Sequence, residues 1–92
     1  LNTIIKGFSL EQNIPNPFTT ETKIAYSIPS SVEFAYLGIY DLSGKQIKTI
    51  NLDKTSNSLI LRTDQLEAGI YIYSLIADGE IAASKRMVIS GK

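Results

Sequence analysis

Carboxylates are the side chains in this sequence best suited to acid–base chemistry, because the 92 residues contain no His and no Cys. Without these two residue types there is no thiol nucleophile, no Ser-His-Asp triad, no His- or Cys-ligated zinc and no disulfide. A catalytic pair of carboxylates must flank a cleft at a defined separation. The aspartates lie instead in stretches that predict turns, where Asp commonly bonds to its own backbone: Asp41, Asp53, Asp64 and Asp78. We therefore expect no catalytic residue, no cofactor and no metal site.

The charges of the chain balance, with 9 Lys and Arg against 9 Asp and Glu and a pI of about 6.4. A nucleic-acid-binding protein normally carries a basic surplus, so nucleic acid is not an expected partner. No apolar run reaches the roughly 18 residues of a membrane-spanning helix, so we expect no transmembrane segment. The first eight residues lack the charged and apolar regions of a secretory signal peptide. On this ground we expect either a cytosolic protein or a piece of a longer chain.

Two segments have an unusual composition. Residues 10–18, LEQNIPNPF, place prolines on both sides of Asn16, which fixes the backbone and favours extended conformations before each proline. Such a segment is either a rigid lead-in that Phe18 anchors to the core or a peptide that a partner reads. The last eight residues, KRMVISGK, hold three cations and no acid. They form either an edge strand that charge protects from aggregation or a strand that a partner recognises.

Aromatic side chains offer a further kind of chemistry, the stacking of sugar rings. Phe34, Tyr36 and Tyr40 share one face of a predicted strand, and Tyr71 and Tyr73 alternate along a later one. Tyrosines in such positions either form a stacking platform or lie half-buried with their hydroxyls in water. A platform of Tyr36, Tyr40, Tyr71 and Tyr73 would indicate an accessory carbohydrate-binding module.

Period-2 alternation of apolar residues places all these segments on or between strands. It predicts strands around residues 24–28, 35–40, 45–52, 58–62, 70–77 and 81–89, and a further one at Ile4 and Ile5. The third of these has a slip in its apolar phase between Ile47 and Ile50, which indicates a β-bulge. Residues 63–68 fit one short helical turn. Short strands spaced about ten residues apart are typical of a β-sandwich.

The last two predicted strands are joined by Asp78-Gly79, and this pair between two apolar runs predicts a tight hairpin. The final strand is interrupted by Lys85. Its alternation puts the following residues on one face: Ile81, Ala83, Met87 and Ile89.

Five segments, in order and with matching spacing, resemble the C-terminal sorting domain (type A) of cargo proteins that the bacterial type IX secretion system exports. They are residues 10–18, 24–29, 37–45, 66–75 and 85–89. The resemblance implies an all-β fold, an Ig-like antiparallel β-sandwich of about seven strands. It also implies that residues 10–92 are the sorting domain and that residues 1–9 link it to a passenger.

A function is implied by the same resemblance. The domain would be a non-catalytic signal that the outer-membrane translocon recognises, so that the attached N-terminal passenger passes from the periplasm to the cell surface or the medium. In many family members a sortase-like peptidase removes the domain and joins the passenger to a surface lipopolysaccharide. The alternatives are an accessory carbohydrate-binding module and a structural Ig-like spacer of a secreted enzyme.

Partner contact is expected at three of the resembling segments. The family's C-terminal strand, the part most tied to recognition, maps to Lys85, Met87, Val88 and Ile89. Its neighbouring motif maps to Gly69 and Tyr71, and its opening motif to Pro15, Asn16, Pro17 and Phe18. We expect main-chain pairing with the last strand to provide affinity, and Lys85, Met87 and Ile89 to provide specificity. The chain departs from the family by ending Ser90-Gly91-Lys92, which leaves the register of the terminal contact open.

Overall fold

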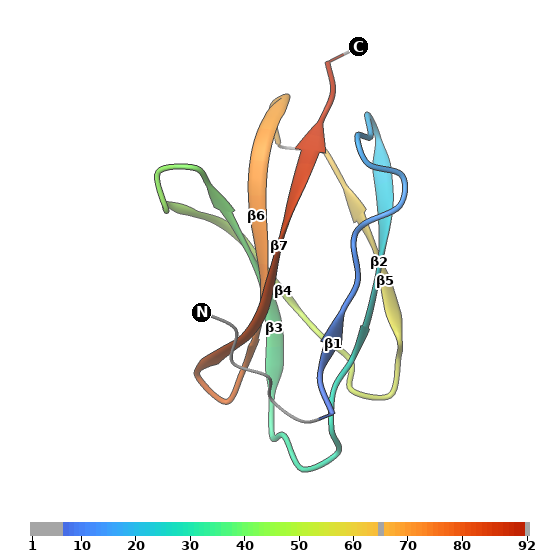
Figure 1. The fold of residues 1–92 in the computed structure, drawn as a ribbon, viewed down its shortest axis with the longest axis vertical. Coiled ribbons are helices and arrows are strands. Elements are labelled where there is room, and N and C mark those ends of the chain that lie inside the picture. Colours follow the sequence, from blue (N-terminus) through green and yellow to red (C-terminus); the bar gives the residue numbers. More distant parts are fainter. Residues whose placement is uncertain (1–6, 65, 92) are drawn as a thin grey trace.

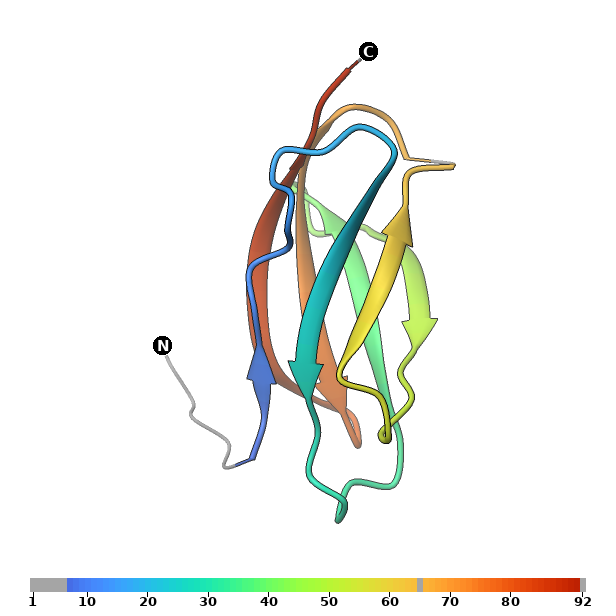
Figure 2. The same cartoon turned by 90° about the vertical axis from the view of Figure 1, so that its right-hand side faces the viewer.

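The structure is a computed structural model and describes residues 7–64 and 66–91. Seven strands form two antiparallel sheets that pack face to face (Figures 1 and 2). One sheet has the order β1-β2-β5, with β1 at Ser9–Leu10, β2 at Glu21–Ser27 and β5 at Ser58–Arg62. The other has the order β4-β3-β6-β7, with β3 at Ala35–Asp41, β4 at Gln46–Asn51, β6 at Gly69–Ala77 and β7 at Glu80–Ile89. The expected Ig-like β-sandwich is confirmed.

The core lies between the two sheets and follows the alternation in the sequence. Ile24 on β2 faces Leu37 and Ile39 on β3, and all three side chains are completely buried. Burial of an aliphatic side chain of this size contributes roughly 1.5–3 kcal/mol, so alternate positions of each strand are held inward. The inner face of β3 lies in the core, and its outer face carries the half-buried Tyr36 and Tyr40, so both faces of the strand are apolar.

The remaining strand positions form two outer faces of different character. Residues that pair directly across an antiparallel ladder share a face, so the register assigns them. The outer face of the four-stranded sheet consists of Tyr36, Gly38, Tyr40, Gln46, Thr49, Asn51, Ile70, Ile72, Ser74, Ile76, Ile81, Ser84, Arg86 and Val88. The outer face of the three-stranded sheet consists of Ser9, Glu21, Lys23, Ala25, Ser27, Ser58, Ile60 and Arg62.

The Asp78-Gly79 hairpin forms as predicted. Both residues have positive φ, 49° and 86°, as the tight two-residue turn requires, and Ala77 pairs with Glu80 across it. The carboxylate of Asp78 also accepts hydrogen bonds from the Glu33 and Phe34 amides, at 3.1–3.3 Å. This aspartate therefore ties the hairpin to the start of β3.

Two further aspartates also stabilise turns, as expected from their positions. The hydroxyl of Ser43 donates to Asp41 Oδ1 at 2.6 Å, and this bond, with that from the Lys45 amide, holds the pKa of Asp41 below its ordinary value. The hydroxyl and the amide of Thr55 lower the pKa of Asp53 in the same way. These carboxylates are hydrogen-bond acceptors for their own turns.

A β-bulge on β4 confirms the slip predicted in that strand. Gln46 pairs with Tyr40 and Lys48 pairs with Ile39, so Ile47 is the extra residue. The bulge bends an edge strand of the four-stranded sheet.

A second bulge, on β7, corrects the expected face of that strand. Ile81 pairs with Ile76 and Ala83 pairs with Leu75, so Ala82 is the extra residue and the alternation changes phase there. Ile81 is therefore 59% exposed on the outer face, and Ala82 is buried in its place. Met87 and Ile89 face the core as predicted.

Where one short helical turn is expected, at residues 63–68, the described residues show a single hydrogen-bonded turn and no helix. The Leu66 amide donates to the Thr63 carbonyl at 2.9 Å. The Thr63 amide bonds instead to the Thr20 carbonyl, which ties this segment to the chain before β2. The strand predicted at Ile4 and Ile5 lies outside the described residues. The strand that the structure adds to the six predicted later in the chain is β1, at Ser9–Leu10.

Candidate partner-binding site

The three segments expected to contact a partner meet around the C-terminal half of β7. In the β6–β7 ladder Gly69 lies opposite Ile89, and Tyr71 lies opposite Met87. Phe18 forms a parallel bridge to Ile89 from the other side. Lys85 lies further back along β7, opposite Tyr73. Residues far apart in the sequence thus form one site around a single strand.

Residues 12–18, which we call the strap, cover the edge of β7 that β6 leaves open. The strap first runs along β2, where Ile14 and Lys23 exchange backbone hydrogen bonds, and then crosses to β7 (Figures 1 and 2). Gln12 Nε2 donates to the Arg86 carbonyl at 2.6 Å, and the Val88 amide donates to Asn16 Oδ1 at 2.9 Å.

Phe18 completes the attachment of the strap. Its amide donates to the Val88 carbonyl at 3.1 Å, and its carbonyl accepts from the Ser90 amide at 2.8 Å. Its ring is buried in the core cluster, with 3% of the residue exposed. The predicted anchoring role of Phe18 is confirmed, and the edge of β7 from Arg86 to Ser90 is paired within the domain.

A buried polar network holds the start of the strap. Asn13, 1% exposed, donates through Nδ2 to the Pro15 carbonyl at 3.0 Å and to Thr22 Oγ1 at 3.1 Å. The Asn13 amide donates to the hydroxyl of Tyr73 at 2.8 Å, and that hydroxyl donates to the Glu11 carbonyl at 2.7 Å. Burial raises the pKa of Tyr73 to about 12. Every buried side-chain nitrogen or oxygen in the described part of the chain has a hydrogen-bond partner.

Exposure divides the predicted contact residues into two groups. Met87 and Ile89 are 0% and 3% exposed, so a partner of the folded domain cannot touch their side chains. The exposed residues of the site are Lys85, Pro15, Asn16 and Pro17, whereas Val88, Gly69 and Tyr71 are half-buried. The hydroxyl of Tyr71 donates a hydrogen bond to the Glu67 carbonyl at 2.7 Å.

The sequence reasoning missed several residues of the site: Gln12, Asn13, Thr22, Tyr73 and Arg86. Arg86 is exposed and lies on the outer face of the four-stranded sheet. It alternates with the buried Met87, and this alternation was the available sign that it faces solvent rather than the core.

The platform of four tyrosines, which the sequence left as an alternative, does not form. Tyr73 is completely buried and faces the core, where its hydroxyl bonds to the strap. Tyr71 lies two residues before it and packs against the same core cluster. Tyr36 and Tyr40 lie on the opposite, outer face of the sheet. Since β-strand neighbours alternate between faces, the four rings cannot stack on one sugar chain.

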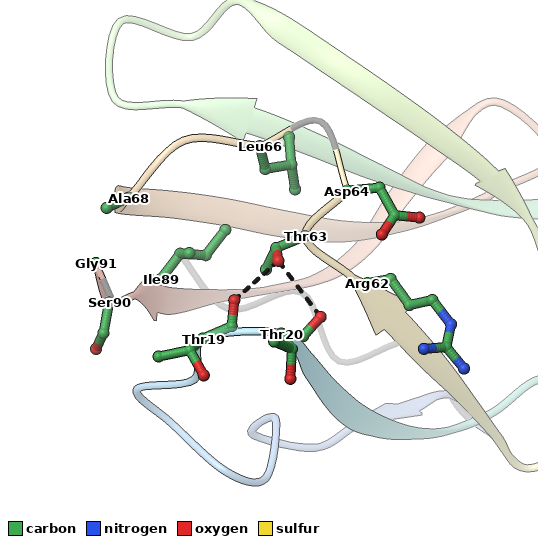
Figure 3. A pocket seen from close by; sticks show the side chains of 10 residues that line it. All are labelled: Thr19, Thr20, Arg62, Thr63, Asp64, Leu66, Ala68, Ile89, Ser90 and Gly91. Atoms are coloured by element: carbon green, nitrogen blue, oxygen red, sulfur yellow. Dashed lines mark hydrogen bonds between the residues drawn. The ribbon is translucent and has the colours of Figure 1, made fainter.

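An open pocket of about 540 Å³ lies beside the end of β7 (Figure 3). The hydroxyl of Thr63 projects into it and donates to the Thr19 carbonyl at 2.8 Å. Of the described residues that line it, Asp64 and Arg62 are the charged ones, and Arg62 pairs with Glu21 at 2.8 Å. The described residues contain no group of three or more His, Cys, Asp or Glu that could hold a metal ion. They also contain no helix of the length and apolarity that a membrane span requires.

Comparison with known proteins gives one match. The family described as "Secretion system C-terminal sorting domain" matches residues 13–90, which include the strap from Asn13 onward and all of β7. No curated protein and no solved structure matches the chain.

Proposed function

Because the chain belongs to the family of type IX secretion system C-terminal sorting domains, we propose that it is the export address of a longer cargo protein. The outer-membrane translocon recognises the domain, and the passenger attached to its N-terminal side passes from the periplasm to the cell surface or the medium. A sortase-like peptidase then separates the domain from the passenger and joins the passenger to a surface lipopolysaccharide. The family match over residues 13–90 is the observation that carries this proposal.

The domain boundary in this proposal lies at the first strand. Residues 1–9 link the passenger to the domain, and residues 10–92 form the domain itself. The proposed boundary falls within β1, which comprises Ser9 and Leu10. We assign no catalysis to the domain, since its family is one of sorting signals. Asp41 and Asp53 bond to their own turns, and Asp78 bonds to the backbone just before β3.

The strap blocks the main-chain pairing with β7 that the sequence led us to expect for recognition. A partner that paired with the backbone of β7 between Arg86 and Ser90 would have to displace the strap and remove Phe18 from the core. Removing a buried Phe side chain costs about 3–5 kcal/mol. We therefore propose that recognition uses exposed side chains such as Lys85. Met87 and Ile89 act indirectly, by fixing β7 in the core.

The proposal is tested by export of a reporter. Residues 1–92 are fused behind a fluorescent reporter that carries its own secretory signal peptide, in a bacterium with a type IX system. The reporter is expected at the cell surface or in the medium, and the same reporter without residues 1–92 is expected in the periplasm. If the complete fusion also stays in the periplasm, the proposed function is wrong.

The role of the C-terminal strand is tested in the same fusion. Deleting residues 85–92 is expected to abolish export, but it also removes Met87 and Ile89 from the core. Lys85→Glu is therefore the more specific change, because Lys85 is exposed. It is expected to reduce export at least several-fold, whereas Lys48→Glu, an equally exposed change on β4, leaves it unchanged. Full export of both the deletion and the Lys85→Glu fusion would remove the role given to this strand.

A further inference from the structure

The outer face of the four-stranded sheet differs from the rest of the surface in its charge. Arg86 is the one charged residue that the register of these four fully described strands places there. The outer face of the three-stranded sheet carries Glu21, Lys23 and Arg62, and Glu21 and Arg62 form an ion pair. Depletion of charge on one face of a small domain is characteristic of the central part of a protein interface.

Side chains on this face already pack against one another in the isolated domain. Ile76 is 5% exposed yet does not belong to the core cluster, so its neighbours on the outer face cover it. The ring of Tyr40 lies over Gly38, where a Cβ would meet the Tyr40 hydroxyl at 2.8 Å. The hydroxyls of Ser74 and Ser84 bond to each other at 2.7 Å. Because these side chains are already held in place, few of them would lose mobility when a partner docks, and the entropic cost of binding is lower.

Arg86 has aliphatic side chains opposite it and on one side. It lies opposite Ile72, between the pair Ile70 with Val88 and the pair Ser74 with Ser84 on the same face. The ion pair recorded among the described residues joins Arg62 and Glu21, so no carboxylate of this part of the chain neutralises Arg86. A guanidinium is weakly hydrated and binds a carboxylate through two parallel hydrogen bonds, so Arg is common at the energetic centre of interfaces.

We propose, on the basis of the proposed function, that the outer face of the four-stranded sheet docks on the secretion machinery, at an apolar protein surface that offers one carboxylate to Arg86. On β7 the strap pairs the edge and Met87 and Ile89 are buried, so the broad contact surface of this strand, beside the single exposed side chain of Lys85, is its outer face. A second copy of this chain is a poorer occupant of the same face. The face carries no carboxylate, so a face-to-face dimer would bury two guanidinium groups without partners.

Matched variants on the two outer faces test the proposal. Arg86→Glu and Ile81→Ser alter the four-stranded face, and Arg62→Glu and Ile60→Ser make the same changes on the three-stranded face. Ile81 and Ile60 are 59% and 50% exposed, so both replacements leave the core intact. Circular dichroism melts establish that each variant is folded. Binding is measured between the immobilised chain and detergent-solubilised outer membranes, from a type IX host and from a strain that lacks the translocon.

The unaltered chain is expected to bind only the membranes that contain the translocon, and more weakly as salt rises. Arg86→Glu is expected to weaken binding about 10-fold or more, and Ile81→Ser about 5- to 10-fold, as for residues at the centre of an interface. Arg62→Glu and Ile60→Ser are expected to bind within about 2-fold of the unaltered chain, as for residues outside an interface.

Three results would overturn the proposal. If all four variants bind like the unaltered chain, the docking face is wrong while the sorting function stands. If the unaltered chain forms a dimer in sedimentation that Arg86→Glu dissociates, or binds anionic phospholipid vesicles through Arg86, the occupant is wrong. Failure of the unaltered chain both to bind translocon membranes and to export its reporter would overturn the sorting function, and this inference with it.

Discussion

Asn13 is the residue on which the position of the strap depends most. It is buried two residues before Pro15, and its side chain bonds to the Pro15 carbonyl, to Thr22 and to Gln12. A buried amide of this kind costs free energy unless all its groups are bonded, and here they are. The strap therefore has one favoured path across the sandwich, and the Asn16 and Phe18 contacts with β7 follow from it.

Replacement of Asn13 by Ala is expected to destabilise the domain. The change removes the donor to two acceptors and leaves Gln12 Nε2 with one acceptor fewer. Hydrogen bonds of this kind contribute about 1 kcal/mol each, and an unsatisfied buried group costs more, so we expect a loss of about 2–3 kcal/mol. Urea unfolding measures this loss. Asn57→Ala, at an exposed position, is the control and should change stability by less than about 0.5 kcal/mol. Equal effects of the two changes would contradict the role of Asn13.

Tyr73 is expected to make the domain sensitive to alkali. Its pKa is raised to about 12 in the folded chain, chiefly by burial, and is about 10 in an unfolded chain. A group with a raised folded pKa contributes stability that is fully present below pH 10 and is lost as pH approaches 12. Thermal unfolding between pH 9 and 12 should therefore show a steeper loss for the natural chain than for Tyr73→Phe. Parallel curves would show that the titration of Tyr73 does not affect stability.

At the level of elements, β7 is an edge strand whose open side is occupied. Edge strands tend to pair with other chains, and proteins cover or charge them to prevent this. Here the strap pairs with β7 through the Val88 and Ser90 backbones, and Asn16 accepts from the Val88 amide with its side chain. The C-terminal strand thus stays in the sandwich even though only β6 pairs with it along its whole length.

Hydrogen exchange is expected to report this pairing. In the natural chain the Val88 amide should exchange slowly, because it bonds to Asn16 Oδ1. Asn16→Ala removes one exposed hydrogen bond worth about 1 kcal/mol, so exchange at Val88 should become about 5-fold faster. Nuclear magnetic resonance measures the rate amide by amide, and amides on β5 serve as the internal control. An unchanged rate at Val88 would mean that Asn16 does not hold this edge.

Local patterns predicted most of the elements but not how they meet. Alternation placed β2, β3 and β6, and Asp78-Gly79 placed the hairpin, because these features depend on near neighbours in the chain. The bulge on β7 could not be predicted, since Ala82 and Ala83 are small and fit either face. The contact of the strap with β7 joins residues about 70 positions apart, and no local pattern encodes such a register.

At the level of the whole molecule, the chain belongs to a family of sorting domains, and its sequence contains no His and no Cys. The sandwich folds around an apolar core and a bonded polar network, and it needs no disulfide to close it. The zero net charge conceals an uneven distribution, because the last eight residues hold three cations and no acid. Charge is also distributed unevenly between the two outer faces. The outer face of the three-stranded sheet carries several charged residues, and that of the four-stranded sheet is nearly uncharged.

The central claim, that the domain is an export address, is tested most directly by comparing one fusion in two strains. A reporter with a secretory signal peptide is joined to residues 1–92 and produced in a type IX host and in the same host without its translocon. The fraction of reporter outside the outer membrane is then measured. We predict that most of the reporter lies outside in the first strain and that nearly all of it stays in the periplasm of the second. Equal fractions outside in the two strains would contradict the claim.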